Sequence, residues 1–516
     1  MPAFTPPAEL PPAIVQPQPA ATATATVEHE SHGIVYVVRG DKFLGAETIG
    51  KVLDGTSDPQ QAIGALYQAY QRAGHFLVAI RGQPGGPRRV TLEIINGQIT
   101  ETDIPDKLRW FYRGIEQRDD ITSSDIIRRS VLAEAYATRE GQKLTAGFGP
   151  AAEFGGSKYT LQAEPLPGAD RWDLSLGFGN YGNRYSSRWL SGADLAVRPG
   201  LGTEFTAGYS EGLPGLDEDS KGSVYRRTSA GGSIVTPWGL YGASWDDVHY
   251  KIGDIAAPFN PIGDVTTWRL TGTQLMYADA STRWTLRQAY VNVENDVAVF
   301  DGLFTLTDQQ YDYVDLGTGL NYTFDWLGRR TSVGLDMGHT RGLSDRSGTF
   351  NPPLPGTPEP EFKTYTAAAS FDYALPAGLR LSANANGRWS EDTLPSQEQW
   401  VLGGFGNLSA YFPSVLVGDS GFLGRASLIG PTWRWADFQL SGSLFLETGG
   451  TQSHFRPAGT PDWQRLSDAG IALNASHRLG TSLSLSSAVP VESSNVARQQ
   501  RDDARSYFYM LLTQRF

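Results

Sequence analysis

Two patterns of hydrophobic and polar residues divide the chain near residue 166. Before that point, short β-branched runs alternate with segments whose apolar residues recur every three to four positions, as in strands and amphipathic helices. After it, apolar and polar residues alternate one by one through many segments, as in strands with one apolar and one polar face. The pattern predicts an α+β N-terminal part followed by a long array of β-strands.

The N-terminal part repeats one order of elements. Strand, helix, helix, strand and strand follow one another from Ile34 to Gly97, and the same order recurs from Gln98 to Glu164. An internal repeat of this size indicates two copies of one supersecondary unit. We therefore predict a disordered Pro/Ala/Thr-rich tail over residues 1–30, a first α/β unit over 31–98 and a second over 99–166.

Residues 167–516 carry the alternating pattern, which a soluble β-sandwich also shows. Three features favour a transmembrane antiparallel β-barrel instead. Trp and Tyr concentrate near the strand ends, as in an interfacial girdle. The polar face is rich in Gly, Ser and Thr, which suits a wet lumen, and the chain stops on a strand that ends in Phe516. We take Phe516 as a candidate signal for membrane assembly.

The length of this region fits a barrel of about 16 strands, since membrane strands need about 9–11 residues each. An even number of strands leaves both barrel ends on the periplasmic side. A spanning sheet must also close on itself, because lipid cannot satisfy an open edge. Four segments are candidate long outer loops: Gly212–Gly222, Gly253–Val265, Asn295–Asp308 and Leu343–Phe362.

Composition narrows the compartment. Cysteine is absent from the 516 residues, which favours an oxidising envelope compartment. The net charge of −12 gives no electrostatic case for a nucleic-acid partner. The N-terminal tail lacks the residue order of an export signal. Because an outer-membrane protein needs such a signal, we expect that it was removed or that the start codon is misplaced.

No group of residues predicts catalysis. Of the seven histidines only His29 and His32 are close in sequence, and they lack the HExxH helix of a zinc site. The phosphate-binding pattern GxxxxGK[ST] does not occur. We therefore expect a protein that is not an enzyme and has no catalytic residue, no cofactor and no metal.

The first unit resembles the polypeptide-transport-associated (POTRA) domain, through the stretch Ala69–Ala79 and the Asn-Gly-Gln-Ile of Asn96–Ile99. The second copy is weaker in sequence, and a generic α/β pair without a transport role is the alternative. Two such units before a 16-stranded barrel resemble two-partner secretion transporters of the haemolysin-activator type. Three barrel segments carry that resemblance: Asn180–Tyr185, the glycine frame from Gly403 to Gly421, and Ala488–Val491.

This resemblance implies that a secreted partner polypeptide crosses the outer membrane unfolded, after capture by periplasmic POTRA domains. It also implies two further partners, outer-membrane lipid and the barrel-assembly machinery. An assembly factor resembling the outer-membrane insertase is the main alternative, although such factors usually carry more POTRA repeats. A passive porin is a third, which the N-terminal units argue against.

The glycine frame implies a long loop, 401–421, that folds into the lumen. In the family its Val-Arg-Gly-Tyr motif pairs the Arg with an acidic residue of a barrel strand. Here the matching residues are Leu408, Ser409, Ala410 and Tyr411, and the acidic residue is Glu447. Ser409 offers at most a neutral hydrogen bond, worth about 1 kcal/mol. We therefore expect other contacts to hold the loop, or a looser loop, and Glu447 to be solvated or paired elsewhere.

A captured polypeptide can add as a strand to an exposed sheet edge through main-chain hydrogen bonds. We predict that the groove between helix and strand in the first unit contributes to this site. Its candidate residues are Tyr67, Tyr70, Phe76 and Val78. The alternative is that these side chains belong to the core, which is favoured for Tyr70 and Phe76.

Overall fold

The computed structural model describes residues 10, 13–15, 26–118, 120–253, 256, 258–343, 357–456 and 462–516. The described chain forms two compact units. The N-terminal unit is built mainly from residues up to Ala169 and contains both α/β units named above, which are still called the first and second unit. The C-terminal unit is built mainly from Asp170 to Phe516. No helix among the described residues is long and apolar enough to cross a membrane.

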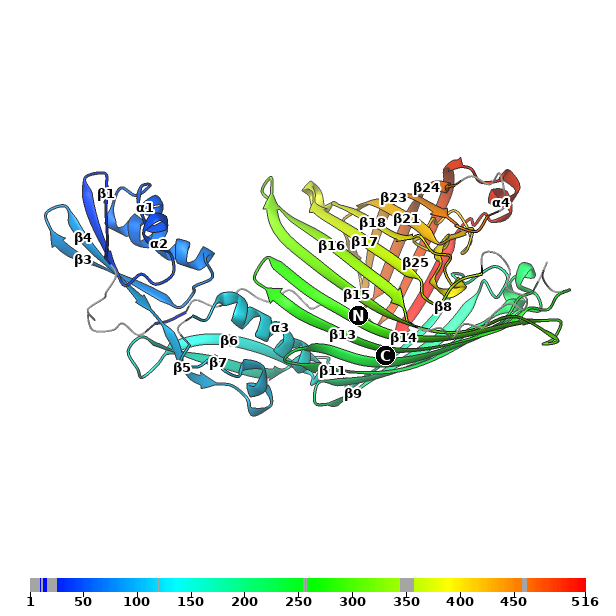
Figure 1. Cartoon of the computed structure of the whole chain (residues 1–516), viewed down its shortest axis with the longest axis horizontal. Helices are drawn as coiled ribbons and strands as arrows, with labels where there is room; N and C mark the ends of the chain where they lie inside the picture. Colours follow the sequence, from blue (N-terminus) through cyan, green and yellow to red (C-terminus); the bar gives the residue numbers. More distant parts are fainter. Residues whose placement is uncertain are drawn as a thin grey trace. The chain divides into compact units, whose positions relative to one another are not determined.

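The N-terminal unit contains two small sheets, each covered by helices (Figure 1). The elements of the first are β1 (Thr26–Ser31), β2 (Ile34–Arg39), α1 (Ala46–Leu53), α2 (Pro59–Arg72), β3 (Val78–Gly86) and β4 (Arg89–Asn96). Those of the second are β5 (Gln98–Asp103), the 3₁₀ helix η1 (Asp106–Tyr112), α3 (Ser123–Arg139), β6 (Gln142–Pro150) and β7 (Gly156–Pro165). A single residue, Gly97, separates β4 from β5.

Topology supports the predicted internal repeat. In the first sheet β2 pairs parallel with β4, and β3 pairs antiparallel with β4. In the second, β5 pairs parallel with β7, and β6 pairs antiparallel with β7. The strand orders β2-β4-β3 and β5-β7-β6 therefore correspond.

The first sheet has one strand more than the repeat predicts. Thr26–Ser31 forms β1 and pairs antiparallel with β2, in a segment that we assigned largely to the disordered tail. Ser31 donates from Oγ to the carbonyl of Thr56 at 3.0 Å, and Val27 packs on the core cluster. The tail prediction is therefore wrong from Thr26 onward. Of residues 1–25, only 10 and 13–15 are described, so most of that prediction lies outside the described residues.

A carboxylate fixes the loop between β2 and α1. Asp41 accepts hydrogen bonds from the backbone N–H groups of Phe43, Leu44 and Gly45, at 3.3, 3.1 and 2.9 Å, and from the hydroxyl of the buried Tyr70. Burial raises the pKa of Asp41, but these hydrogen bonds outweigh it, so the net effect lowers the pKa below its ordinary value. Burial and the Asp41 charge together raise the pKa of Tyr70, which therefore stays protonated.

Replacing Asp41 by alanine should destabilise the first unit by about 2–3 kcal/mol, because a buried hydroxyl and three backbone groups lose their acceptor. Since the folded pKa is depressed, the wild-type contribution is present above the unfolded pKa of about 3.9 and is lost as the pH falls through the folded value. Urea unfolding of a fragment spanning residues 26–169 at pH 7 and pH 3 measures both effects. A D41A difference of equal size at the two pH values would contradict the assignment.

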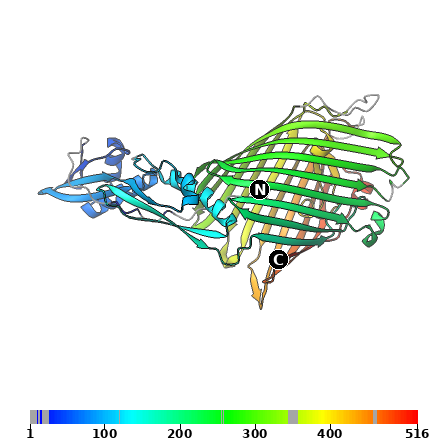
Figure 2. The ribbon, with the colours of Figure 1, turned by 90° about the horizontal axis from the view of Figure 1, so that it is seen from below.

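The C-terminal unit is a closed antiparallel β-barrel. The strands of its wall, within the described residues, are β8 (Trp172–Gly179), β9 (Leu190–Gly200), β10 (Thr203–Gly212), β11 (Val224–Thr236), β12 (Gly239–Lys251), β13 (Ile262–Ala278), β14 (Thr282–Val299), β15 (Phe304–Trp326), β16 (Arg329–Gly342), β17 (Lys363–Ala374), β18 (Arg380–Ser390), β21 (Ser420–Ile429) with β22 (Trp433–Trp435), β23 (Phe438–Gln452), β24 (Gln464–His477), β25 (Thr481–Ser494) and β26 (Tyr509–Arg515). Because β21 and β22 both pair with β23, they count as one interrupted strand of the barrel wall. The barrel therefore has the 16 strands predicted. Figure 2 shows these strands side by side and tilted.

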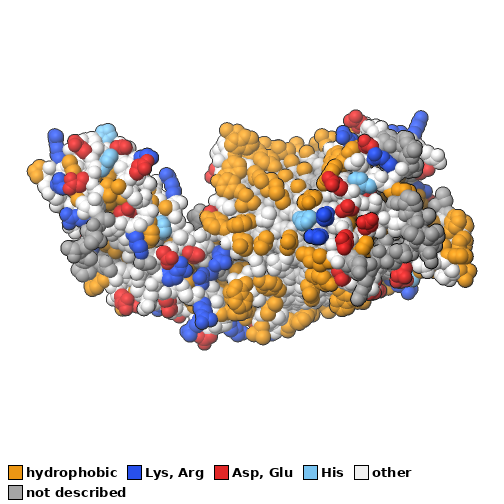
Figure 3. Space-filling view, viewed as in Figure 1, with side chains coloured by type: hydrophobic (Ala, Val, Ile, Leu, Met, Phe, Trp, Pro, Cys, Tyr) orange, Lys and Arg blue, Asp and Glu red, His pale blue; other side chains and the backbone are white. Residues whose placement is uncertain are grey.

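The two faces of the wall differ as the alternation predicts. On β23, Leu444 and Leu446 are 59% and 60% exposed on the outside, whereas Phe445 and Glu447 between them are 3% and 2% exposed. Figure 3 shows hydrophobic side chains covering much of the barrel surface. Inside, a cavity of about 430 Å³ is lined largely by small and polar residues, including Asp336, Asn384 and Arg425. An apolar outer face and a polar lumen are the surfaces that a membrane barrel needs.

The candidate outer loops differ from the prediction in one important place. Most of Asn295–Asp308 is strand, because β14 runs to Val299 and β15 begins at Phe304. Alternation continues past the stretch needed to cross lipid, so the pattern alone did not mark where the membrane ends. Gly253–Val265 likewise ends in the first residues of β13. Residues 344–356 of the Leu343–Phe362 segment lie outside the described residues.

Candidate functional site: a loop held inside the barrel

The segment between β18 and β21 folds against the inner wall. Its base is a small two-stranded sheet, β19 (Trp400–Leu402) paired with β20 (Leu416–Gly418). Its tip packs Leu408, Ala410 and Tyr411, all fully buried, into one cluster with wall residues such as Phe445 and Leu466. These wall residues lie on β23 and β24, so the loop rests on that side of the lumen.

Backbone groups at the loop tip bind two carboxylates of the wall. The N–H of Ser409 donates to Glu447 Oε2 at 2.7 Å, and the N–H of Ala410 donates to Asp468 Oδ2 at 2.7 Å. Glu447 on β23 and Asp468 on β24 are directly opposite in register. Two consecutive amides of the loop tip therefore bind two neighbouring acidic side chains of the wall, which attaches the tip at two points. The Ser409 hydroxyl instead accepts from the N–H of Gly406 at 3.2 Å.

An arginine of the wall neutralises Glu447. Arg425 lies on β21, opposite Glu447 in register, and its Nη1 donates to Glu447 Oε1 at 2.6 Å. Its guanidinium also lies 4.1 Å from the ring centroid of Phe445, a cation–π contact. The Glu447 side chain is 0% exposed, so a positive partner is needed to offset the cost of burying its charge. Arg425 thus supplies, from the wall, the charge that Ser409 cannot supply from the loop.

The last connection of the chain, between β25 and β26, holds the other side of the tip. It contains α4 (Arg498–Asp503). The carbonyl of Ala504 accepts from the N–H of Phe412 at 2.7 Å, and the N–H of Ser506 donates to the carbonyl of Ala410 at 2.8 Å. The Tyr509 hydroxyl donates to the carbonyl of Tyr411 at 2.6 Å. The tip is therefore fixed between the wall carboxylates and this connection.

The motif around Asp419 ties the loop base to its neighbours. The buried Asp419 accepts from the backbone N–H of Leu394 at 2.8 Å and from that of His454 at 2.7 Å. The Ser420 hydroxyl donates to the carbonyl of Ser390 at 3.1 Å and accepts from its N–H at 3.0 Å. The second half of the glycine frame therefore joins the loop base to the segments after β18 and β23.

Asn180, in the first of the resembling segments, closes the barrel seam. Its amide nitrogen donates to the carbonyl of Phe508 at 3.0 Å, and its amide oxygen accepts from the N–H of Met510 at 2.6 Å. These bonds link the end of β8 to the start of β26. At the other end of the seam, Phe516 and Leu174 exchange backbone hydrogen bonds, and the Phe516 side chain is exposed. Hydrogen bonds therefore join β8 to β26 at both ends of the seam.

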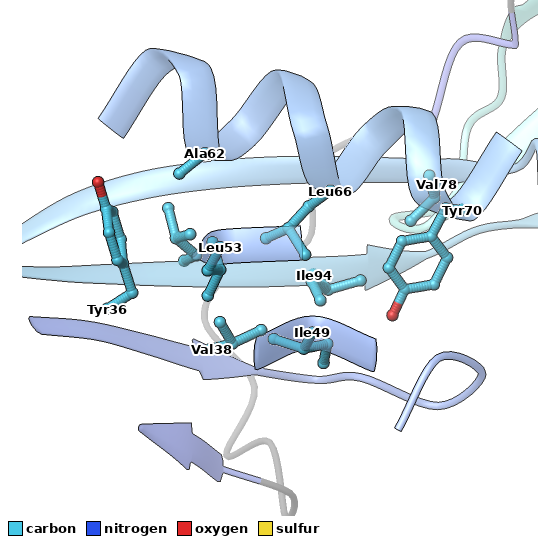
Figure 4. Packing of buried hydrophobic residues seen from close by; sticks show 10 residues of the cluster. Tyr36, Val38, Ile49, Leu53, Ala62, Leu66, Tyr70, Val78 and Ile94 are labelled. Carbon is cyan, nitrogen blue, oxygen red and sulfur yellow. The ribbon is translucent and has the colours of Figure 1, made fainter. Parts of the chain in front are cut away.

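The candidate groove of the first unit is mostly core. Tyr70, Phe76 and Val78 are 0–4% exposed, and Figure 4 shows Tyr70 and Val78 within the hydrophobic cluster between α2 and the sheet. Phe76 also contacts Phe148 of the second unit, with ring centroids 5.4 Å apart. These three side chains cannot form an open docking surface, and the core alternative is the correct description of them. Only Tyr67 is partly exposed, at the margin of the cluster.

Sequence reasoning missed two residues of the loop site. Arg425 and Asp468 occupy inward positions among Gly, Ser and Ala, where charged residues look like ordinary lumen side chains. Arg425 is found as the partner of Glu447 only once the β21–β23 register is known. Asp468 binds only a backbone N–H of the loop, which leaves no signal in the loop sequence.

Fold and loop together define a class of protein: an outer-membrane β-barrel preceded by two α/β units, with a lumenal loop fixed to the wall. A family model described as haemolysin secretion/activation protein ShlB/FhaC/HecB matches residues 155–476. The chain belongs to this family. It is a two-partner secretion transporter of the bacterial outer membrane, with its N-terminal domains in the periplasm.

Solved structures agree in fold. CdiB from Escherichia coli is 17% identical with a TM-score of 0.75, and the alignment covers 98% of this chain and 94% of that one. CdiB from Acinetobacter baumannii is 12% identical with a TM-score of 0.68, with the same coverage of both chains. No curated protein matches the chain by sequence.

Proposed function

We propose that the periplasmic units capture an unfolded partner polypeptide and that the 401–421 loop must leave the inner wall before that polypeptide passes. The attachment of the loop tip carries this proposal. Two backbone amides and one arginine converge on Glu447 and Asp468, and hydrogen bonds to the connection before β26 hold the other side of the tip, so the loop is held by a limited set of non-covalent contacts. Such an attachment can be broken and re-formed without unfolding the barrel.

We assign residues 31–98, together with β1 (Thr26–Ser31), to POTRA 1, residues 99–166 to POTRA 2 and residues 167–516 to the barrel. Capture is proposed at a sheet edge of POTRA 1 rather than at its buried side chains. The edge strands of that sheet are β1 and β3, and β3 adjoins α2, which carries the partly exposed Tyr67. An extended polypeptide can gain main-chain hydrogen bonds at such an edge, with apolar side chains against the neighbouring helix.

We further propose that the barrel-assembly machinery recognises the exposed Phe516 ring, and that lipid covers the apolar outer face. Lipid-facing residues such as Leu444, Ile471 and Leu473 on adjacent strands β23 and β24 are 46–60% exposed. Transfer of this surface from water is worth about 25 cal/mol per Å² of apolar area.

Deleting the gene should remove one large secreted protein from the culture medium, which mass spectrometry of the secreted proteome would identify. Restoring the gene with Tyr67→Ala should recover secretion only in part, because the capture edge loses an apolar contact of about 1–2 kcal/mol. The matched control is Gln68→Ala, at an exposed position of the same helix. An unchanged secretome together with defective assembly of other barrels would instead favour an insertase.

A further inference from the structure

Two loops of the barrel are joined to each other on its extracellular side. Residues 180–189 connect β8 to β9, and residues 213–223 connect β10 to β11. Because β8 follows directly after the periplasmic units, the ends of β8 and β10 that lead into these loops lie outside the membrane. The buried Ser220 hydroxyl accepts from the N–H of Arg188 at 3.2 Å and donates to the carbonyl of Arg184 at 3.1 Å. We call residues 180–189 and 213–223 together the outer latch.

Two arginines of the outer latch are held by two of its aspartates. Arg184 Nε donates to Asp219 Oδ2 at 2.9 Å, and Arg188 Nη1 donates to Asp217 Oδ2 at 3.4 Å. The two arginine side chains are only 21% and 19% exposed. Salt screens partly buried ion pairs less than exposed ones. The two carboxylates therefore fix the positions of both guanidinium groups.

The two guanidinium groups lie against the loop tip. Their central carbons are 5.9 Å (Arg184) and 5.0 Å (Arg188) from the ring centroid of Phe412, which is a cation–π arrangement. Phe412 directly follows Tyr411 of the tip, and its side chain is buried. The outer latch therefore contacts the tip from the extracellular side.

Polar contacts join the outer latch to the tip and to the last connection of the chain. Arg184 Nη1 donates to the carbonyl of Asp503 at 2.5 Å, and Asn183 Nδ2 donates to Ser414 Oγ at 3.5 Å. Asp503 belongs to α4, in the connection that also accepts the N–H of Phe412. The tip, the last connection and the outer latch therefore contact one another in all three pairs.

The latch contacts are separate from the attachment to the inner wall. Glu447 and Asp468 bind the N–H groups of Ser409 and Ala410. The outer latch contacts residues 412 and 414 instead, through side chains that come from other strands of the barrel. A tip that leaves the wall while the outer latch stays in place must therefore break a second set of contacts.

We propose that the outer latch is a second fastening of the loop tip, and that Arg184 and Arg188 are positioning residues that keep the tip on the wall from the extracellular side. The proposal rests on the proposed function, in which the loop leaves the wall before transport. It adds the contacts on the extracellular side that must open for that movement.

Two fastenings on one tip support each other. While the wall holds Ser409 and Ala410, Phe412 stays close to the two arginines, so the effective concentration for the latch contact is high. The outer latch raises the effective concentration for the wall contacts in the same way. Loss of either fastening should therefore weaken the other, and the tip should stay closed only while both are intact.

The first test measures gating of the assembled full-length protein in planar bilayers. Arg184→Ala with Arg188→Ala should raise the open probability about tenfold, because two cation–π contacts and their ion pairs are lost. Lysine at both positions should give an intermediate value, since it keeps the charge but not the planar face. The matched control is Arg226→Ala, which removes an exposed ion pair with Glu211 on neighbouring strands. It should gate as wild type.

Heat-modifiable mobility on gels checks that each of these barrels is assembled. Wild-type gating in the assembled double alanine variant would overturn the outer latch. An equal rise in the Arg226→Ala control would also overturn it, because the effect would then not depend on contact with the tip.

The second test locks the outer latch to the tip in secreting cells. The chain contains no cysteine, so Asn183→Cys with Ser414→Cys creates one addressable pair. A short, reducible thiol crosslinker between them should lower secretion of the partner about tenfold, since the tip is then tethered, and a reductant should restore it. Each single cysteine variant, treated in the same way, should secrete as wild type.

Failure of the two residues to crosslink would contradict their contact, and undiminished secretion by the crosslinked protein would show that the tip does not need to leave the outer latch. Either result would overturn this proposal and leave export intact. No secretion by wild type would instead overturn the proposed function itself.

Discussion

Arg425→Ala should release the lumenal loop, raise the conductance of the barrel in planar bilayers and lower its thermal stability. The substitution leaves the carboxylate of Glu447 buried without its positive partner. Removing one member of a buried ion pair costs about 3–5 kcal/mol. Arg425 is partly exposed, so we expect about 3 kcal/mol, at the lower end of that range. Secretion should fall as well, since a loosely held loop no longer closes and opens as a unit.

Two second-site changes separate charge from packing. Adding Glu447→Gln to Arg425→Ala removes the unpaired charge and should recover most of the stability, although one strong acceptor for the Ser409 N–H is weakened. Adding Ser409→Arg instead should recover loop closure, because residue 409 already lies against Glu447 and a new guanidinium could reach that carboxylate. Unchanged conductance and melting temperature in the single variant would show that Arg425 does not hold the loop.

Deleting Tyr509–Phe516 should abolish barrel assembly. Without β26, the edges of β8 and β25 remain unpaired in the membrane, where each unsatisfied backbone group costs several kcal/mol. The Asn180 bond to Met510 is lost at the same time, and Phe508, which accepts the other Asn180 bond, becomes the chain end. We expect no heat-modifiable species and rapid proteolysis of the product.

Phe516→Ala distinguishes barrel closure from recognition by the assembly machinery. The backbone bonds between Phe516 and Leu174 do not need the ring, so the assembled variant should melt at the wild-type temperature. If the ring is recognised during assembly, the amount of assembled barrel should fall severalfold. Val491→Ala, at another exposed apolar position of the barrel, is the matched control and should assemble normally. Equal amounts of all three proteins would remove Phe516 from the assembly proposal.

The barrel could be predicted because apolar and polar residues alternate one by one along its strands, and this alternation directly assigns side chains to the outer and inner faces of the wall. The extent of β14 and β15 could not, because strands keep the same period after they leave the lipid. The class of residue changes instead, from Leu316 and Val314 to Asp312 and Asp308. The change from apolar to acidic residues can be seen in the sequence once the pairing of β14 with β15 is known. Without that register, the acidic segment resembles a polar loop.

The groove prediction is wrong for Val78, and the favoured core alternative holds for Tyr70 and Phe76, for a related reason. An apolar stripe on a helix is the signature both of a core and of a binding groove, and the stripe containing Tyr70 serves the core. Sequence also cannot assign the partner of a buried carboxylate when that partner is a strand neighbour. Arg425 and Glu447 are far apart along the chain and meet only through the β21–β23 register.

The position of Arg425 bears on how relatives of this transporter are found in genomes. A profile that demands arginine in the lumenal loop would score this chain as defective, although its Glu447 carries a full ionic partner. A residue on a neighbouring strand and a residue of the loop can both reach Glu447, so either position can supply its positive partner. A sequence search that asks for a basic residue on one strand and an acidic residue on the neighbouring strand would group such chains with functional exporters rather than with copies that have lost their function.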